Sequence, residues 1–235
     1  MLIEKGNIER GELGFVPTPA GTRSHRPISH IEFLTMVEKQ LIENGWEISA
    51  ESHIVTHEGL RHFGLLTVRS GLDTGEFTQV VGIRNSHDKR FPAGIVCGSQ
   101  VLVCSNLCFS GEIAVVRKHT RFIWKQLPEL VSSAVGQLRE GWQNEANRIR
   151  IYHDCEVEDV DVHDLTIQAL DRGVISGSKV PKVLNEYRNP QHTEFQPRTM
   201  WSWFNAVTQV LKGTSIQDLP GRTENLFGLC DDYIK

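Results

Sequence analysis

The sequence predicts an α+β fold: an N-terminal antiparallel sheet of three to five strands with a flanking helix, followed by a mainly helical C-terminal half. Three observations support this fold class. Runs rich in β-branched residues are confined to residues 46–109. Short turn signals such as Glu58-Gly59 join consecutive runs, which favours antiparallel pairing. After Thr120 the apolar residues recur at helical spacing.

The same observations divide the chain into three regions. Residues 1–28 include "GFVPTPAGTRSHRP", which is rich in Gly and Pro without a hydrophobic period and predicts an irregular N-terminal arm. Residues 29–120 are expected to form the sheet domain with its helix. Residues 121–235 are expected to form a helical region that packs on the sheet or makes a C-terminal subdomain.

The first predicted helix begins directly after the arm. Ser29 is a suitable N-cap residue, and Glu32 follows it in the capping-box arrangement. The helix is expected to end near Asn44 and Gly45. Its apolar face comprises Ile31, Phe33, Leu34, Met36, Val37, Leu41 and Ile42.

Strands are expected in the runs "WEISAESHIVTH", "RHFGLLTVRS" and "GEFTQVVGIRN", and one or two more in "AGIVCGSQVLVCSNLCF". Helical spacing returns in residues 123–152, with Pro128 expected in the first turn. A shorter helix is expected to stop at Gly173, and another at Lys212-Gly213.

Composition excludes several classes of protein. No window approaches the roughly 18 consecutive apolar residues that a membrane helix needs. The polar, acidic N-terminus argues against a secretory signal. Five cysteines at irregular spacing argue against a disulfide framework and favour a reducing, cytoplasmic setting.

Charge is distributed unevenly along the chain, although the net charge is only −4. Residues 82–125 hold seven Lys/Arg against two Asp/Glu, a balance of +5, and residues 151–172 hold one Arg against seven Asp/Glu, a balance of −6. Such blocks are typical of a polyanion-binding face beside an acidic surface. They also fit two solvated faces, or two segments that neutralise each other.

No motif in the chain specifies a metal or a cofactor, and none is expected. Cys104 and Cys108 have the spacing of one zinc-ligand pair, but no second pair accompanies them, and buried core positions are the better interpretation of the cysteines. Alternation along the strand would place His53 and His57, but not His62, on one face. The acidic residues between 154 and 164 are typical of a solvated segment.

Two basic clusters favour nucleic-acid binding, with single-stranded DNA as the preferred ligand. The first lies at the end of a predicted strand, where side chains and backbone N–H groups can converge on phosphates. The second interleaves basic residues with Phe122 and Trp124, an arrangement that suits stacked bases. The candidate residues are Arg84, Ser86, His87, Lys89, Arg90 and Asn106 in or beside the first cluster, and Arg117, Lys118, Arg121 and Trp124 in the second.

The central segment resembles the phage/plasmid-like proteins that share a domain of unknown function. An R-x-S-x-D element matches Arg84, Ser86 and Asp88, and a G-x-x-V-x-V-C-x-N element matches Gly98, Val101, Val103, Cys104 and Asn106. A C-terminal element of that family is matched by Trp201, Asn205, Ala206, Thr208 and Arg222. The resemblance implies a phage, plasmid or integrated-element origin, without a settled activity.

The order of predicted elements is also similar to that of Rad-fifty-two-type single-strand annealing proteins. Those proteins form oligomeric rings that hold DNA in a basic groove, so this resemblance implies a homo-oligomer and a role in recombination. Where they carry a long Lys/Arg-rich helix, this chain has "FPAGIVCGSQVLVCSN".

The first functional hypothesis is therefore a mobile-element protein that binds nucleic acid in replication, recombination or DNA protection. The second is a phage-encoded inhibitor of a host defence system or host enzyme, which would bind its partner through Asp154, Glu156, Glu158, Asp159 and Asp161. The third is an enzyme with a non-standard site at Arg84, Ser86, His87, Asp88 and Asn106. It ranks last, because no nucleophile–base pair can be named from spacing.

Overall fold

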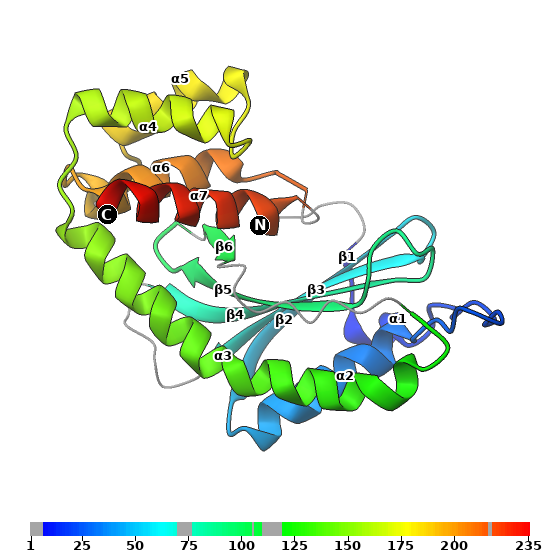
Figure 1. The fold of residues 1–235 in the computed structure, drawn as a ribbon. Helices are drawn as coiled ribbons and strands as arrows, with labels where there is room; N and C mark the ends of the chain where they lie inside the picture. The colour runs from blue at the N-terminus through cyan, green and yellow to red at the C-terminus, as the bar shows by residue number, and fades with distance from the viewer. Residues whose placement is uncertain (1–6, 70–76, 105, 110–118, 216–217) are drawn as a thin grey trace.

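The computed structural model describes residues 7–69, 77–104, 106–109, 119–215 and 218–235. Its centre is a six-stranded antiparallel sheet in which every strand pairs with its sequence neighbour (Figure 1). The strands are β1 (Asn7–Ile8), β2 (Glu47–Thr56), β3 (Arg61–Arg69), β4 (Phe77–Ser86), β5 (Gly94–Val101) and β6 (Leu107–Phe109). The segment after Ala93 thus forms two strands, as expected.

Seven α-helices accompany the sheet in the described residues. They are α1 (Arg10–Leu13), α2 (His30–Glu43), α3 (Ile123–Asp154), α4 (Asp159–Asp171), α5 (Val180–Arg188), α6 (Met200–Leu211) and α7 (Leu219–Ile234). Short 3-10 turns lie at η1 (Gly177–Lys179) and η2 (Thr193–Phe195). The predicted α+β class, with a mainly helical C-terminal half, is confirmed. None of the helices in the described ranges is long and apolar enough to cross a membrane.

One face of the sheet is covered by α2 and the first half of α3 (Figure 1). The predicted apolar positions of α2 pack there, with Phe33, Leu34, Val37 and Leu41 fully buried, whereas Ile42 is exposed. Trp46 meets Trp142 of α3 edge-on, at 5.2 Å between ring centroids. The indole N–H of Trp142 also donates to the carbonyl of Gly98, so this helix is tied to the middle of β5.

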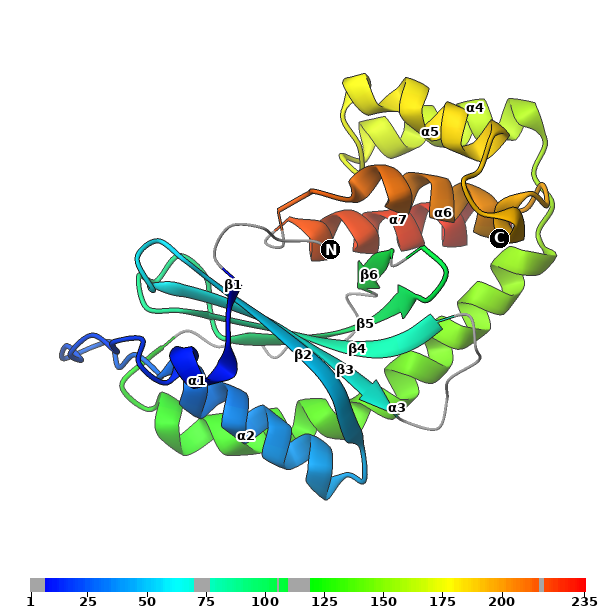
Figure 2. The same cartoon turned by 180° about the vertical axis from the view of Figure 1, so that it is seen from behind.

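The C-terminal helices cover the other face only near β4, β5 and β6 (Figure 2). Phe109 packs directly over Gly82 and Gly98, two positions where a Cβ atom would collide with its ring. The core beyond it contains Trp203 and Phe204 of α6 and Phe227 of α7. The second half of α3 joins this core through Ile149 and Tyr152, so one helix contributes to both layers.

The N-terminal arm is more ordered than the sequence predicts, and the sheet has one strand more than the upper limit of five. β1 pairs with β2, and α1 follows it with a capping box between Glu9 and Glu12. Arg10 of α1 forms ion pairs with Glu38 of α2 and Glu51 of β2. These contacts come from other elements, which is why the local Gly- and Pro-rich composition does not reveal them.

The starts of two helices differ from the prediction, one in its capping and one in its position. Ser29 is the N-cap of α2 as expected, but its side chain makes no capping hydrogen bond, so the predicted capping box is absent there. Pro128 lies inside α3, which begins at Ile123 rather than beside the proline. Because proline has no backbone N–H, the carbonyl of Trp124, four residues earlier, lacks the hydrogen bond that another residue at position 128 would donate.

Candidate nucleic-acid interface

The loop between β4 and β5 is organised by Asp88. Its carboxylate accepts hydrogen bonds from the Ser86 hydroxyl at 2.5 Å and from the Arg90 backbone N–H at 3.1 Å. Arg61 of β3 adds an ion pair at 2.7 Å. Burial acts to raise the pKa of Asp88, but these hydrogen bonds and the guanidinium outweigh it and lower the pKa below its usual range. Asp88 is therefore a structural anion that shapes the loop.

This loop presents Lys89 and Arg90 to solvent. Both side chains are exposed, and neither forms an ion pair with another described residue. Lys89 has a φ of 64°, in the left-handed region that favours glycine. Backbone conformations of this kind cost about 1 kcal/mol and cluster at functional sites. The loop thus holds two unpaired cations at the end of the sheet.

A pocket of about 500 Å³ lies beside the loop. Three segments that are distant in sequence line it: the arm with Ser24 and His25, the β4–β5 loop, and the residues before α3 with His119 and Thr120. The ring Nδ1–H of His25 donates to the carbonyl of His119 at 2.9 Å, and the two rings stack at 5.5 Å. The arm is thereby fixed against the start of α3. We call this hollow the loop pocket.

A second hollow of about 300 Å³ is lined by the same arm and by α3, with Arg26 and Trp124 among its residues. Three residues before Trp124, the guanidinium of Arg121 lies over the exposed ring of Phe122, at 4.6 Å from the ring centroid. Residues 19–27, 84–92 and 119–125 together carry seven Lys/Arg and one acidic residue, Asp88, a balance of +6. These three segments form a basic surface with exposed aromatic rings, which we call the basic surface.

Several predicted residues meet on the basic surface. Ser86, Lys89 and Arg90 line the loop pocket. Arg84 lies over the ring of Phe91, at 5.7 Å to its centroid, and burial lowers the pKa of its guanidinium. Trp124 lines the second hollow, and Arg121 lies three residues before it. Arg117 and Lys118 lie outside the described residues.

Two predicted residues lie elsewhere. His87 is buried, stacks on His30 at 3.9 Å and donates to the carbonyl of Ile28, so its ring is turned into the protein. Asn106 is buried against α6, where its amide donates to Thr208 at 2.9 Å. The residues of the enzyme hypothesis, Arg84, Ser86, His87, Asp88 and Asn106, therefore do not lie together in one site.

His87 belongs to a chain of buried histidine rings under the β2–β3 hairpin end. His30 lies between His87 and His62, and His62 lies 5.4 Å from His53 between ring centroids. The expectation that His53 and His57 share one face of a strand is wrong, because β2 ends at Thr56 and His57 lies in the exposed turn after it with a φ of 54°. The register instead places His53 diagonally across from His62. Nevertheless, among the described residues no group of three or more His, Cys, Asp and Glu side chains is placed to hold a metal ion.

The cysteines of the central segment occupy core positions, as the sequence predicts. Cys97, Cys104 and Cys108 are buried, and burial raises the pKa of the Cys104 and Cys108 thiols. A raised pKa keeps a thiol protonated and a poor nucleophile.

The arm supplies residues that the sequence analysis did not select. Arg26 and His25 come from the stretch "TRSHRP", and Arg23 is exposed between them and the arm's prolines. Two arginines and a histidine within five residues are a basic signal in a segment otherwise classified as irregular. His119 lies within the second basic cluster, between Lys118 and Arg121, but was not among the predicted binding residues.

The acidic residues occupy the opposite end of the molecule, at the junction of α3 and α4 (Figures 1 and 2). The described residues of the two charge blocks therefore do not neutralise each other. Glu158 and Asp161 form the capping box of α4, and the side chains of Asp154, Glu156 and Asp159 are exposed. Carboxylates at this position also stabilise the positive N-terminal end of the helix.

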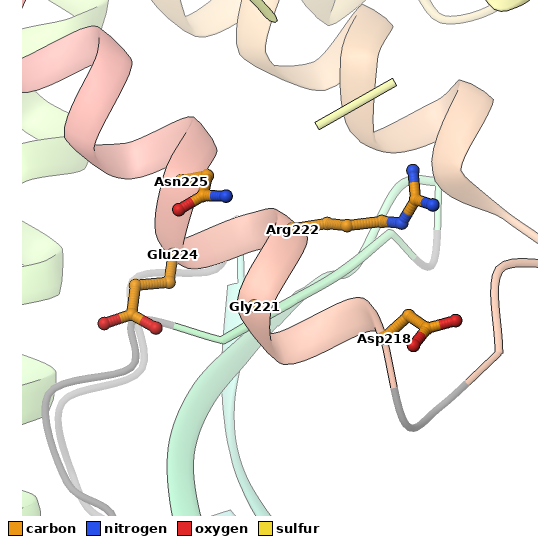
Figure 3. A pocket seen from close by; sticks show the side chains of 5 residues that line it. All are labelled: Asp218, Gly221, Arg222, Glu224 and Asn225. Carbon is orange, nitrogen blue, oxygen red and sulfur yellow. The ribbon is translucent and has the colours of Figure 1, made fainter. Parts of the chain in front are cut away.

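Figure 3 shows a shallow pocket on α7, at a place where side chains of this helix hold a neighbouring segment of the chain. Of its lining residues, Arg222 donates to the carbonyl of Val174 at 2.8 Å and Asn225 donates to the carbonyl of Arg172 at 3.0 Å. Both side chains are thus engaged in holding the segment that follows α4. The hydrogen-bond donors of Arg222 and Asn225 therefore serve the fold, and we assign no ligand to this pocket.

Comparisons of the chain with protein-family models, with curated proteins and with solved structures give no match.

Proposed function

We propose that the protein binds single-stranded nucleic acid, with single-stranded DNA preferred, across the basic surface. The observation that carries this proposal is the convergence of three sequence-distant basic segments around two hollows with no acidic residue in their linings. Lys89, Arg90, Arg26 and Arg121 are suited to contact phosphates, because all four side chains are exposed. Phe122 and Trp124, both exposed, offer rings on which bases can stack.

Within the same proposal, the protein acts in replication, recombination or protection of mobile-element DNA in the cytoplasm of a host cell. The resemblance of the central segment to phage/plasmid-like proteins supports that context, and the similarity in element order to annealing proteins supports a homo-oligomer. Sedimentation at several concentrations, with and without a DNA strand, measures the oligomeric state.

The test compares single-stranded DNA binding by the wild type with that by Lys89→Gly/Arg90→Ala. We expect the variant to bind about tenfold more weakly at low salt, and its plot of log affinity against log salt to be shallower by about 1.4. Lys89→Gly suits the positive φ at this position, so the variant is expected to remain folded. Fluorescence anisotropy with a labelled oligonucleotide across a salt series measures both quantities.

A matched control is Arg150→Ala/Lys182→Ala, which removes two exposed positive charges from α3 and α5. It should bind nearly as well as the wild type. Equal weakening in both variants would mean that only net charge matters, and absence of salt-dependent binding by the wild type would refute the proposed function.

A second candidate function is docking to a basic protein partner through α4. The observation that favours it is the outer side of this helix, where Val160 and Ile167 are exposed beside Asp159 and Asp164. If the interface comprises this face and the acidic residues that lead into α4, Asp154→Asn/Glu156→Gln/Asp159→Asn should lose a stoichiometric partner that the wild type captures from host lysate. The N-cap pair Glu158 and Asp161 is left intact, so that α4 keeps its capping box. A variant that still captures the same partner would exclude the acidic contact.

A further inference from the structure

Two histidines, His25 and His119, line the loop pocket, and three of their four ring nitrogens have no hydrogen-bond partner among the described residues. His119 is only 5% exposed, and neither of its ring nitrogens has a hydrogen-bond partner among the described residues. His25 is 9% exposed, and its Nε2 is likewise without a partner there. Both residues line the pocket, so these buried nitrogens lie directly behind its wall.

Buried ring nitrogens without hydrogen-bond partners reduce the stability of the folded protein. A buried polar atom without a partner costs about 1–3 kcal/mol, and native proteins retain few of them without a ligand, an ordered water or a functional reason. Burial also lowers the pKa of His119 to about 4, with the neighbouring His25 acting in the same direction. The fold therefore holds a neutral His119 ring, whose one N–H has no partner among the described residues, in the wall of a basic pocket.

The rest of the lining complements an anion. Lys89 and Arg90 provide positive charge without a competing ion pair in the described residues, and the hydroxyl groups of Ser24 and Thr120 provide further donors. Asp88, the nearest carboxylate in sequence, is already engaged by Arg61 and by Arg90's own backbone N–H. Phe91 and Pro92 add an apolar side, which suits a sugar or a base next to the anion.

We propose that the loop pocket binds the terminal phosphate monoester of a nucleic-acid strand. This inference rests on the proposed function and adds to it a preference for one strand end. A phosphate monoester carries a charge of about −1.5 to −2 at pH 7, whereas each internal phosphodiester carries one negative charge. The two cations and the buried N–H donor favour the higher charge. A volume of about 500 Å³ exceeds that of a phosphate alone and leaves room for the terminal nucleoside.

The experiment measures affinity for one oligonucleotide sequence in three forms: with a 5′-phosphate, with a 3′-phosphate and with hydroxyl groups at both ends. We expect one phosphorylated form to bind about tenfold more tightly than the hydroxyl form, as charge-assisted hydrogen bonds to a buried donor imply. His119→Phe keeps a ring of similar shape to stack on His25 but removes both nitrogens. In this variant the ratio of the two affinities should fall to about one.

Three outcomes would overturn the inference. Equal binding of all three forms would show that the pocket does not recognise a strand end, while leaving the proposed function intact. If both His119→Phe and Lys89→Gly still prefer the phosphorylated strand, the strand end is recognised outside the loop pocket. Lys89→Gly is included because it removes a surface charge but retains the His119 ring. Binding of a deoxynucleoside monophosphate or of inorganic phosphate as tight as that of the phosphorylated strand would identify a free phosphate compound as the ligand. Absence of binding to any strand at low salt would instead refute the proposed function itself.

Discussion

Acidification from pH 7 to pH 4.5 is expected to lower the free energy of unfolding steeply, because the folded protein buries several histidines in their neutral form. Burial lowers the pKa of His30 to about 4, and the nearby His87 acts in the same direction. The pKa of His62 is well below its usual value, again mainly through burial, and those of His53 and His87 are also lowered. In each case the unfolded chain binds a proton more readily than the folded protein does.

The direction of the effect follows from that difference. Well above the unfolded-state pKa of about 6.5 these histidines are neutral in both states, so their contribution to the free energy of unfolding is fully retained. As the pH falls from about 6.5 towards 4, the unfolded state gains protons that the folded state does not. Each such histidine then lowers the free energy of unfolding by about 1.4 kcal/mol per pH unit. Asp88, with its lowered pKa, adds a similar loss only at still lower pH.

Urea unfolding at pH 7.5, 6.5, 5.5 and 4.5 measures this effect, because the fitted free energy can be plotted against pH. We expect a plateau only near pH 7.5, the start of the decline by pH 6.5, and a slope of several protons at pH 5.5 and below. His62→Phe removes one titrating ring, so its slope should be smaller by about one proton. A free energy of unfolding that does not change between pH 7.5 and 4.5 would contradict the buried, neutral state of the histidine chain.

Gly98→Ala is expected to destabilise the fold by about 3 kcal/mol, the upper part of the range for overpacking a core. A Cβ atom at this position would lie 2.4 Å from the backbone oxygen of Cys108 and 2.7 Å from the ring of Phe109. Neither neighbour can retreat easily. Gly98 pairs with Phe109 in the sheet, and its own carbonyl accepts the indole N–H of Trp142. The substitution would therefore separate β5 from β6 or from α3.

Gly136→Ala is the matched control, since Gly136 is exposed on α3 and a Cβ atom there meets nothing within 4 Å. That substitution should stabilise the protein by about 0.5–1 kcal/mol, through the higher helix propensity of alanine. Thermal and urea unfolding of both variants give the comparison. If Gly98→Ala is as stable as the wild type, the close approach of Phe109 to β5 is not present in solution.

Elements with a strong local pattern were predictable from the sequence. β2, β3 and β4 were recognisable as runs rich in β-branched residues bounded by turn signals, and α2 and α3 by apolar spacing along one buried face. By contrast, α5 and α7 were not expected. α7 contains Pro220, Gly221 and Gly228, residues that lower intrinsic helix propensity, and it is stabilised by packing of Leu226 and Phe227 into the core.

The candidate site was predictable only in part, for a related reason. The loop from Ser86 to Arg90 could be recognised because polar and basic residues follow a strand directly. The wall of the loop pocket could not, because His25 and His119 are separated by 94 residues and meet only when the arm packs on the start of α3. Asn106 shows the opposite case. It lies near the loop in sequence, but the pairing of β6 with β5 carries it to α6.

The most direct test of nucleic-acid binding at the basic surface is to map where a bound strand touches the protein. Single-stranded DNA carrying 5-iodouracil can be photo-crosslinked to the protein and the modified residues identified by mass spectrometry. We expect crosslinks at Phe91, Phe122 and Trp124, whose rings border the two hollows or the basic residues between them. Crosslinks confined to α4–α7, with none in residues 19–27, 84–92 or 119–125, would contradict the account.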